Sequence, residues 1–124
     1  HEVRFENGVA IPTSAAAAFN GNPELNNPED LFVASVVGCH MLTFLAVASI
    51  KKFTVDLYTD NAEGFLEKDS SGKMVMNRII LRPQIVFSGS HKPTSEELAA
   101  LHEKAHNGCF IANSIKSTVI IEQQ

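Results

Sequence analysis

The sequence predicts a single α+β domain over residues 1–124, with its elements in the order ββαββαβ and its strands mainly antiparallel. Three observations predict it. A nineteen-residue run without formal charge, Phe32–Ile50, is long enough for one central helix. Two segments rich in β-branched and aromatic residues follow it and are separated by a turn. A second, amphipathic helix then precedes a final β-forming segment, and the whole chain has the length of one small domain.

The first two strands are predicted at Val3–Phe5 and Val9–Ile11. Asn7 and Gly8 lie between them, and both residue types tolerate the positive φ angles of a tight hairpin turn. The segment from 12 to 27 has no clear period and is expected to be a loop.

The central helix is predicted to begin at Pro28, because proline suits the first turn of a helix. Asn27 is the expected N-cap, and Glu29 and Asp30 lie at the positive end of the helix dipole. The helix is predicted to end near Lys52.

This helix is apolar all round. Its length fits a membrane span, but His40 near its middle would be costly there, so we expect a helix that is buried on nearly every side. A domain this small has few elements to surround such a helix. We therefore expect a homodimer, in which a second subunit supplies the missing cover, and no membrane.

The two β-forming segments, Phe53–Glu67 and Met74–Phe87, are predicted to form a long antiparallel hairpin around the turn at 69–72. Pro83 lies inside the second segment and has no N–H for a sheet hydrogen bond, which indicates an edge or a bulge.

The second helix is predicted to start with a capping box made by Thr94 and Glu97 and to end at Gly108. Its apolar stripe should cover one face of the sheet; the stripe contains Leu98, Leu101 and Ala105. A short turn over 110–114 and a last strand over Thr118–Ile121 complete the chain.

The composition excludes some functions. Fourteen acidic against ten basic residues, without a basic face, argue against nucleic acid as a partner. Two cysteines are too few for a disulfide scaffold and fit a reducing compartment, so we expect the cytoplasm. The sequence begins with His1 rather than methionine, so we expect upstream residues to be missing, and a targeting segment there stays open.

The two cysteines are the residues with the most reactive chemistry. Cys39 lies in the apolar run, and Cys109 follows it by seventy positions. Free cysteines are often inert core residues, and an apolar site raises the pKa of a thiol. A reactive Cys39 would therefore need a cation nearby, and the chain has three arginines: Arg4, Arg78 and Arg82. Glu29 could hold such an arginine, but it lies about 15 Å from Cys39 along one helix, which again indicates a site between subunits.

The motifs around both cysteines resemble those of the OsmC/Ohr family of osmotically inducible and organic-hydroperoxide-resistance proteins. Residues 27–35 read NPEDLFVAS, and Gly38-Cys39 follows at the family's Glu-to-Cys spacing. The segment 105–114, AHNGCFIANS, is similar to that of a less characterised branch of the family.

The resemblance implies a thiol-dependent peroxidase, built as an intertwined homodimer, that needs no metal or organic cofactor. Cys39 would attack an organic hydroperoxide and become a sulfenic acid, and Cys109 would convert it to a disulfide. A dithiol similar to dihydrolipoamide would then reduce the disulfide. Glu29 would orient the activating arginine.

The arginine is where the chain departs from the family pattern. One branch has it ten residues before the glutamate, where this chain has Phe19. Arg4 is the one arginine upstream of Glu29, so it is the candidate, unless the activating arginine precedes His1. An aromatic residue often follows the first cysteine in the family, whereas this chain has His40.

Two other functions stay open. Zinc accepts a ligand set of two sulfurs and two nitrogens, which Cys39, His40, His106 and Cys109 could supply. A non-enzymatic stress protein or small-molecule-binding protein could use an apolar pocket around Cys39. We expect His40 to be a buried residue facing the second subunit, and His106 to be either a partner of Cys109 or a helix-end residue. We expect His102 and Glu103 to be solvated.

Overall fold

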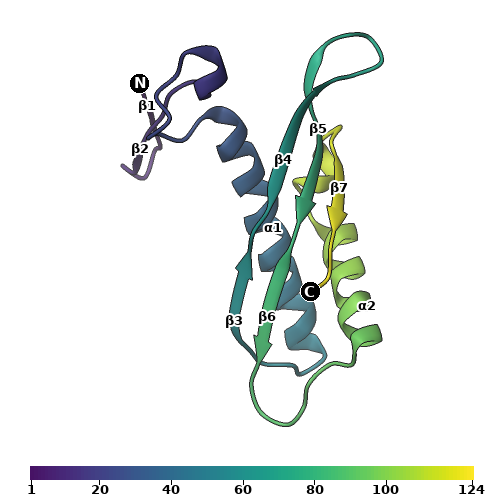
Figure 1. Cartoon of the computed structure of the whole chain (residues 1–124). Helices are drawn as coiled ribbons and strands as arrows, with labels where there is room; N and C mark the ends of the chain where they lie inside the picture. The colour runs from purple at the N-terminus through teal and green to yellow at the C-terminus, as the bar shows by residue number, and fades with distance from the viewer.

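The computed structural model describes residues 1–124 as an α+β fold, as the sequence predicts. Figure 1 shows a long helix, α1, behind a twisted β-sheet, with the second helix, α2, beside it. The elements, with two short 3₁₀ turns, are β1 Glu2–Arg4, β2 Ala10–Pro12, η1 Ala17–Phe19, α1 Pro28–Ile50, β3 Val55–Asp60, β4 Glu63–Lys68, β5 Met74–Leu81, β6 Pro83–Phe87, α2 Ser95–Gly108, η2 Ala112–Ser114 and β7 Thr118–Ile121.

The N-terminal hairpin stands apart from the rest of the chain. Strands β1 and β2 pair with each other alone, with Val3 opposite Ile11, and lie beyond the N-terminal end of α1 (Figure 1). The turn forms as predicted, because Gly8 adopts a φ of 91° and the Asn7 side chain accepts a hydrogen bond of 3.0 Å from the Val9 N–H.

Local sequence signals fix both helix starts. The Asn27 side chain accepts a hydrogen bond from the Asp30 N–H at 2.9 Å, and the Asn27 N–H donates to Asp30 Oδ2 at 3.0 Å, which forms a capping box. Thr94 and Glu97 form the predicted box in front of α2. Helix α1 ends at Ile50, close to the predicted residue, and Lys52 adopts a φ of 62° as the chain turns back.

The predicted long hairpin is present, but each of its two arms is interrupted once. Strand β3 pairs antiparallel with β6, and β4 pairs antiparallel with β5. The second arm breaks at Arg82, next to Pro83, where the sequence indicates an irregularity. The last strand is an exception to antiparallel pairing, because β7 runs parallel to β5 with Val119 opposite Ile79.

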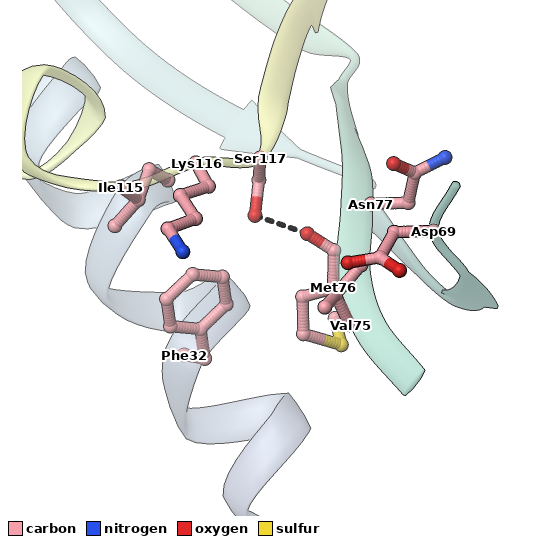
Figure 2. A pocket seen from close by; sticks show the side chains of 8 residues that line it. All are labelled: Phe32, Asp69, Val75, Met76, Asn77, Ile115, Lys116 and Ser117. Carbon is pink, nitrogen blue, oxygen red and sulfur yellow. Dashed lines mark hydrogen bonds between the residues drawn. The ribbon is translucent and has the colours of Figure 1, made fainter. Parts of the chain in front are cut away.

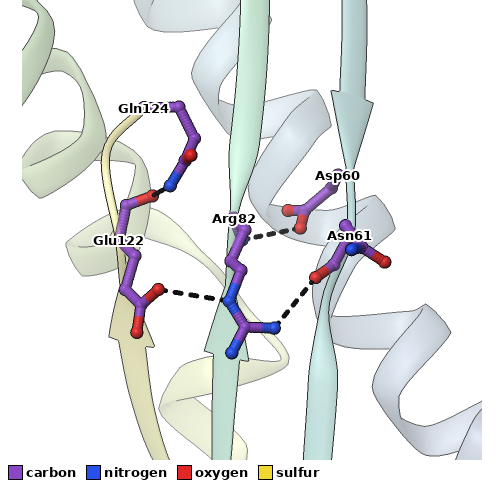
Figure 3. Close-up of polar contacts among 5 residues, drawn as sticks. All are labelled: Asp60, Asn61, Arg82, Glu122 and Gln124. Atoms are coloured by element: carbon purple, nitrogen blue, oxygen red, sulfur yellow. Dashed lines mark hydrogen bonds and ion pairs between the residues drawn. The ribbon is translucent and has the colours of Figure 1, made fainter.

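A polar cluster joins the two interruptions to the C-terminal segment (Figure 3). The Arg82 N–H donates to Asp60 Oδ1 at 2.8 Å, and the Arg82 guanidinium donates to the Asn61 carbonyl at 3.3 Å. Its Nε also donates to Glu122 Oε2 at 3.1 Å. One arginine therefore connects the end of β3, the end of β5 and the residue after β7.

The core has two parts, and α1 contributes to both. Val36 packs with Ile79 and Leu81 under the sheet. Phe44 and Ala48 pack with residues that include Leu101 and Ala105 of α2. The apolar stripe of α2 therefore lies against α1, rather than mainly on a sheet face as the sequence suggests, because the small Ala48 and Ala105 side chains allow the two helices to approach.

The opposite face of α1 is uncovered within one chain. Leu42 is 65% exposed and Ile50 is 78% exposed, although the helix has an apolar sequence all round. By length and composition α1 could cross a membrane, a test that the core helix of a water-soluble protein also passes. Its N-terminal capping box, its buried face and its contacts with α2 make it the central helix of this fold.

Candidate functional site

The two cysteines lie where the two helices meet. Cys39 is in the middle of α1 and is partly exposed. Cys109 is the C-cap residue of α2 and has no solvent exposure. Their sulfurs interact, since each changes the pKa of the other, so the structure brings together the two thiols that the sequence singles out.

A glycine at the end of α2 allows this approach. A Cβ atom on Gly108 would lie 3.2 Å from the Thr43 Cγ2 atom of α1, which is tighter than an ordinary contact. Thr43 is one helical turn after Cys39, and its hydroxyl donates a 2.8 Å hydrogen bond to the Cys39 carbonyl. The end of α2 therefore meets α1 next to Cys39.

The turn after α2 directs backbone N–H groups toward the sulfurs. The Ala112 N–H donates to Cys109 Sγ at 3.4 Å, and the Asn113 N–H donates to the Cys109 carbonyl at 3.0 Å. Successive N–H groups in such a turn form a concave site of partial positive charge that favours anions.

This turn lowers the pKa of the Cys39 thiol below its ordinary value. Burial acts to raise that pKa, but hydrogen bonds to the sulfur outweigh it. In decreasing order of effect, the groups that lower this pKa are the backbone of Ile111, the side chain of Cys109, the backbone of Phe110 and the side chain of Thr43.

The pKa of the Cys109 thiol is raised instead. Burial is the main cause, and the hydrogen bond to Cys39 and the charge of its thiolate add to it. The two thiols thus differ in exposure and in pKa. Cys39 is the accessible sulfur that ionises first, whereas Cys109 is a buried thiol beside it.

Neither of the other two predicted site residues reaches Cys39 within one chain. Arg4 lies on β1, where its exposed side chain pairs with Glu2. Glu29 lies in the first turn of α1 and takes part in none of the three ion pairs. The remaining arginines are also paired elsewhere, Arg78 with Glu67 and Arg82 with Glu122, each at 3.1 Å.

The histidines are placed differently from the prediction. His40 faces α2 of its own chain, not a second subunit, and its Nε2 lies 3.1 Å from Nδ1 of His102. His102 is buried rather than solvated, because α2 turns it toward α1 and onto the Phe44 ring. The pKa of both histidines is lowered to about 4, by burial in each case and, for His40, also by the nearby His102 and His106 charges.

The zinc alternative has no site in this structure. No three histidine, cysteine, aspartate or glutamate side chains form a group that could hold a metal ion. His40 turns its Nε2 to His102, so the two histidines bond to each other rather than converging with the sulfurs.

An open hollow lies near the N-terminal end of α1 (Figure 2). Its volume is about 500 Å³, and Phe32, Val75, Met76 and Ile115 give it an apolar floor with Lys116 among the polar residues that line it. Phe32 precedes Cys39 by seven residues, so both lie on the same side of α1, about 10 Å apart along the helix.

Sequence reasoning missed Thr43 and the backbone of Phe110 and Ile111. Thr43 could have been found, because four residues after Cys39 is the spacing of neighbours on one helix face. Backbone N–H groups do not depend on the residue type, so the sequence carries no signal for the turn itself.

The fold and the two interacting cysteines define an α+β protein with a paired-thiol site. Residues 21–124 match the family model described as OsmC-like protein, and the chain therefore belongs to this family. This confirms the resemblance seen in the motifs. No curated protein sequence matches the chain.

Solved structures of similar proteins agree with this assignment. An OsmC-like protein of unknown function from Vibrio cholerae is 41% identical, with a TM-score of 0.97 over 100% of this chain and 83% of that one. An organic hydroperoxide resistance protein from Elizabethkingia anophelis has 23% identity and a TM-score of 0.77 over 98% and 84% of the two chains. The organic hydroperoxide resistance protein OhrB of Bacillus subtilis has 23% identity and a TM-score of 0.73 over 99% and 89%.

Proposed function

We propose that this protein is a thiol-dependent peroxidase that reduces organic hydroperoxides in a reducing compartment, the cytoplasm, as part of defence against oxidative stress. The observation that carries the proposal is the contrast between the two thiols. Cys39 is accessible and has a lowered pKa, and Cys109 is buried beside it with a raised pKa. A nucleophilic thiolate next to a second thiol is the arrangement that a two-cysteine peroxidase needs.

The reaction begins at the Cys39 thiolate. Its sulfur attacks the terminal oxygen of the hydroperoxide, the O–O bond breaks, and the products are a Cys39 sulfenic acid and an alkoxide that takes up a proton to become an alcohol. The Cys109 sulfur then attacks the sulfenic acid sulfur, water leaves, and a Cys39–Cys109 disulfide forms. A dithiol similar to dihydrolipoamide reduces this disulfide and becomes a cyclic disulfide itself.

The first step also prepares Cys109 for the second. Two of the causes that raise the Cys109 pKa, its hydrogen bond to Cys39 and the Cys39 charge, come from the Cys39 thiolate. A sulfenic acid carries no such charge, so the pKa of Cys109 falls once Cys39 has reacted. The backbone N–H of Ala112, which bonds to Cys109 Sγ, then favours the attacking thiolate.

The apolar hollow supports an organic hydroperoxide, rather than hydrogen peroxide, as the substrate. Its apolar floor lies on the same side of α1 as Cys39 and would hold the hydrocarbon part of a hydroperoxide. Two of the similar structures are organic hydroperoxide resistance proteins, which agrees with this substrate class.

We further propose that the working form is a homodimer. The exposed apolar face of α1, with Leu42, would pack against a second copy, and Phe110, which is 79% exposed beside the site, would be covered as well. Arg4 of the second copy, on its separate hairpin, would approach Cys39, with Glu29 holding its guanidinium. The arginine would then lower the Cys39 pKa further.

Replacing Leu42 with glutamate is expected to separate the subunits, because a charge would be buried in an apolar interface. Light scattering should show a mass near twice that of the chain for the native protein and near 13.5 kDa for the variant. Leu57→Glu is the matched control, since Leu57 is 54% exposed on β3, away from α1. A native protein with the mass of one chain would contradict the dimer.

The peroxidase is tested by the consumption of cumene hydroperoxide with dihydrolipoamide as reductant. Cys39→Ser should reduce turnover to the uncatalysed background, because serine is not ionised at neutral pH and cannot form a sulfenic acid. In the absence of the dithiol, Cys109→Ser should consume one equivalent of hydroperoxide per chain and then stop, with mass spectrometry finding oxidised Cys39 and no internal disulfide.

Two controls make this test specific. Ser35→Ala changes a hydroxyl on the same helix, which bonds only to the Phe32 carbonyl, and should keep full turnover. Glutathione in place of the dithiol should support slower turnover, since a dithiol resolves the mixed disulfide within one molecule. A native protein that consumes no hydroperoxide, or a Cys39→Ser variant that still does, would contradict the peroxidase and favour a non-enzymatic binding protein.

A further inference from the structure

The Cys39 sulfur obtains its stabilisation within one chain from neutral groups rather than from an arginine. Each of the three arginines has its own carboxylate partner elsewhere, and none of them contributes to the Cys39 pKa. Among the groups that do contribute, Cys109 is the one that itself titrates. The position of the turn after α2 therefore decides how strongly the thiolate is held.

Thr43 is the residue of α1 that contacts both Cys39 and Gly108 at the end of α2. Its hydroxyl donates to the Cys39 carbonyl at 2.8 Å, which fixes the side-chain rotamer. With the hydroxyl held there, the methyl group faces Gly108, where even a Cβ atom would approach it to 3.2 Å. The contact between Gly108 and the Thr43 methyl group therefore limits how closely the C-terminal end of α2 approaches α1.

The turn that carries the N–H groups continues directly from that contact. Cys109 follows Gly108, and its carbonyl and sulfur accept the N–H groups of Asn113 and Ala112, at 3.0 Å and 3.4 Å. These bonds make the turn a rigid unit, so a displacement of Gly108 would move the N–H groups of Phe110 and Ile111 as well.

We propose that Thr43 is a positioning residue for the Cys39 thiolate: its hydroxyl, bonded to the Cys39 carbonyl, fixes the side chain, and its methyl group contacts Gly108 so that the N–H groups of Phe110 and Ile111 form an anion-binding turn over the sulfur. The proposal rests on the proposed thiol chemistry of Cys39. It explains how a mid-helix cysteine, whose own helix offers no free N–H groups, obtains them from the turn that follows another helix.

The test is the pH dependence of Cys39 alkylation by iodoacetamide, followed on the Cys39 peptide by mass spectrometry. Thr43→Val keeps the shape but removes the hydroxyl bond that fixes this side chain, so the turn should shift and alkylation at pH 6 should slow about three- to tenfold as the thiol pKa rises. Thr43→Ser keeps the hydroxyl but lacks the methyl group that contacts Gly108, so it should recover only part of the native rate. Gly108→Ala should slow alkylation too, because the added Cβ displaces the turn.

Ser35→Ala is the matched control, since Ser35 makes a similar bond to a carbonyl of the same helix, from its hydroxyl to Phe32 at 2.6 Å. Its alkylation profile should remain native. Circular dichroism would first show that Thr43→Val and Gly108→Ala are folded. The proposal is overturned if both folded variants keep the native pH dependence of Cys39 alkylation, or if Ser35→Ala shifts it equally. Alkylation needs neither peroxide nor reductant, so a protein without peroxidase turnover would still give a clear result here.

Discussion

Lowering the pH from 7 to 5 is expected to remove about 2 kcal/mol of the free energy of unfolding for each of the two buried histidines, His40 and His102. Both have a pKa of about 4 in the folded protein, against about 6.5 in an unfolded chain. Between these values the unfolded state binds more protons. The stability is therefore full above pH 6.5 and decreases as the pH falls toward 4.

The surroundings of the pair explain why a proton is excluded. His40 and His102 stack with ring centroids 5.3 Å apart and share one hydrogen bond, and His106 is the next titratable group that affects His40. No carboxylate shifts the pKa of either ring. A charge on one ring would thus be buried without a counter-ion.

Urea denaturation at a series of pH values would measure this effect. The double variant His40→Gln/His102→Gln keeps amide hydrogen-bonding groups but does not titrate, so its stability should vary much less between pH 7 and 5. His91→Gln, at an exposed histidine, is the control and should keep the native profile. Asp60 acts in the opposite direction, since burial raises its pKa, but it is present in every variant. Equal pH profiles for the native protein and the double variant would contradict the assignment.

Phe44→Ala is expected to lower the free energy of unfolding by about 3–5 kcal/mol, the range for removing a fully buried aromatic side chain. Phe44 has no solvent exposure and lies at the centre of the cluster between α1 and α2. Its ring contacts that of His102, with centroids 4.6 Å apart, and that of Tyr58 at 5.7 Å. Alanine would leave a cavity that three elements share.

Denaturant titration at pH 7 would measure this loss. Phe19→Ala is the matched control, because the same side chain is 58% exposed in the turn η1, and its loss should change stability by less than about 0.5 kcal/mol. A Phe44→Ala variant as stable as Phe19→Ala would show that the cluster does not hold the two helices together.

The local parts of the fold could be predicted from the sequence because their signals are local. Asn27 and Thr94 cap their helices through residues three positions away, and Asn7 and Gly8 make the hairpin turn by their own backbone preferences. Cys39 and Cys109 could be selected because thiols carry unusual chemistry. The motifs around them also resemble the family that residues 21–124 match.

The parts that could not be predicted depend on how distant segments pack. His102 is polar and precedes Glu103 and Lys104, so the sequence predicts it to be solvated, yet it is buried because α2 lies on α1. The parallel pairing of β7 is set by the path of α2, which returns the chain to the β5 edge. Arg4 and Glu29 do not reach Cys39 within one chain, and the residue pattern of one chain does not position the second copy proposed above.

The pairing of β7 with β5 also has a consequence for how the chain folds during synthesis. The hairpin of β4 and β5 can form as soon as both have left the ribosome, because its contacts are close in sequence. The third strand of that sheet is the last element of the chain, and Glu122, the partner of Arg82, follows it directly. A chain that has been synthesised only as far as α2 thus exposes the β5 edge until β7 emerges, so protection of that edge from other nascent chains falls to chaperones.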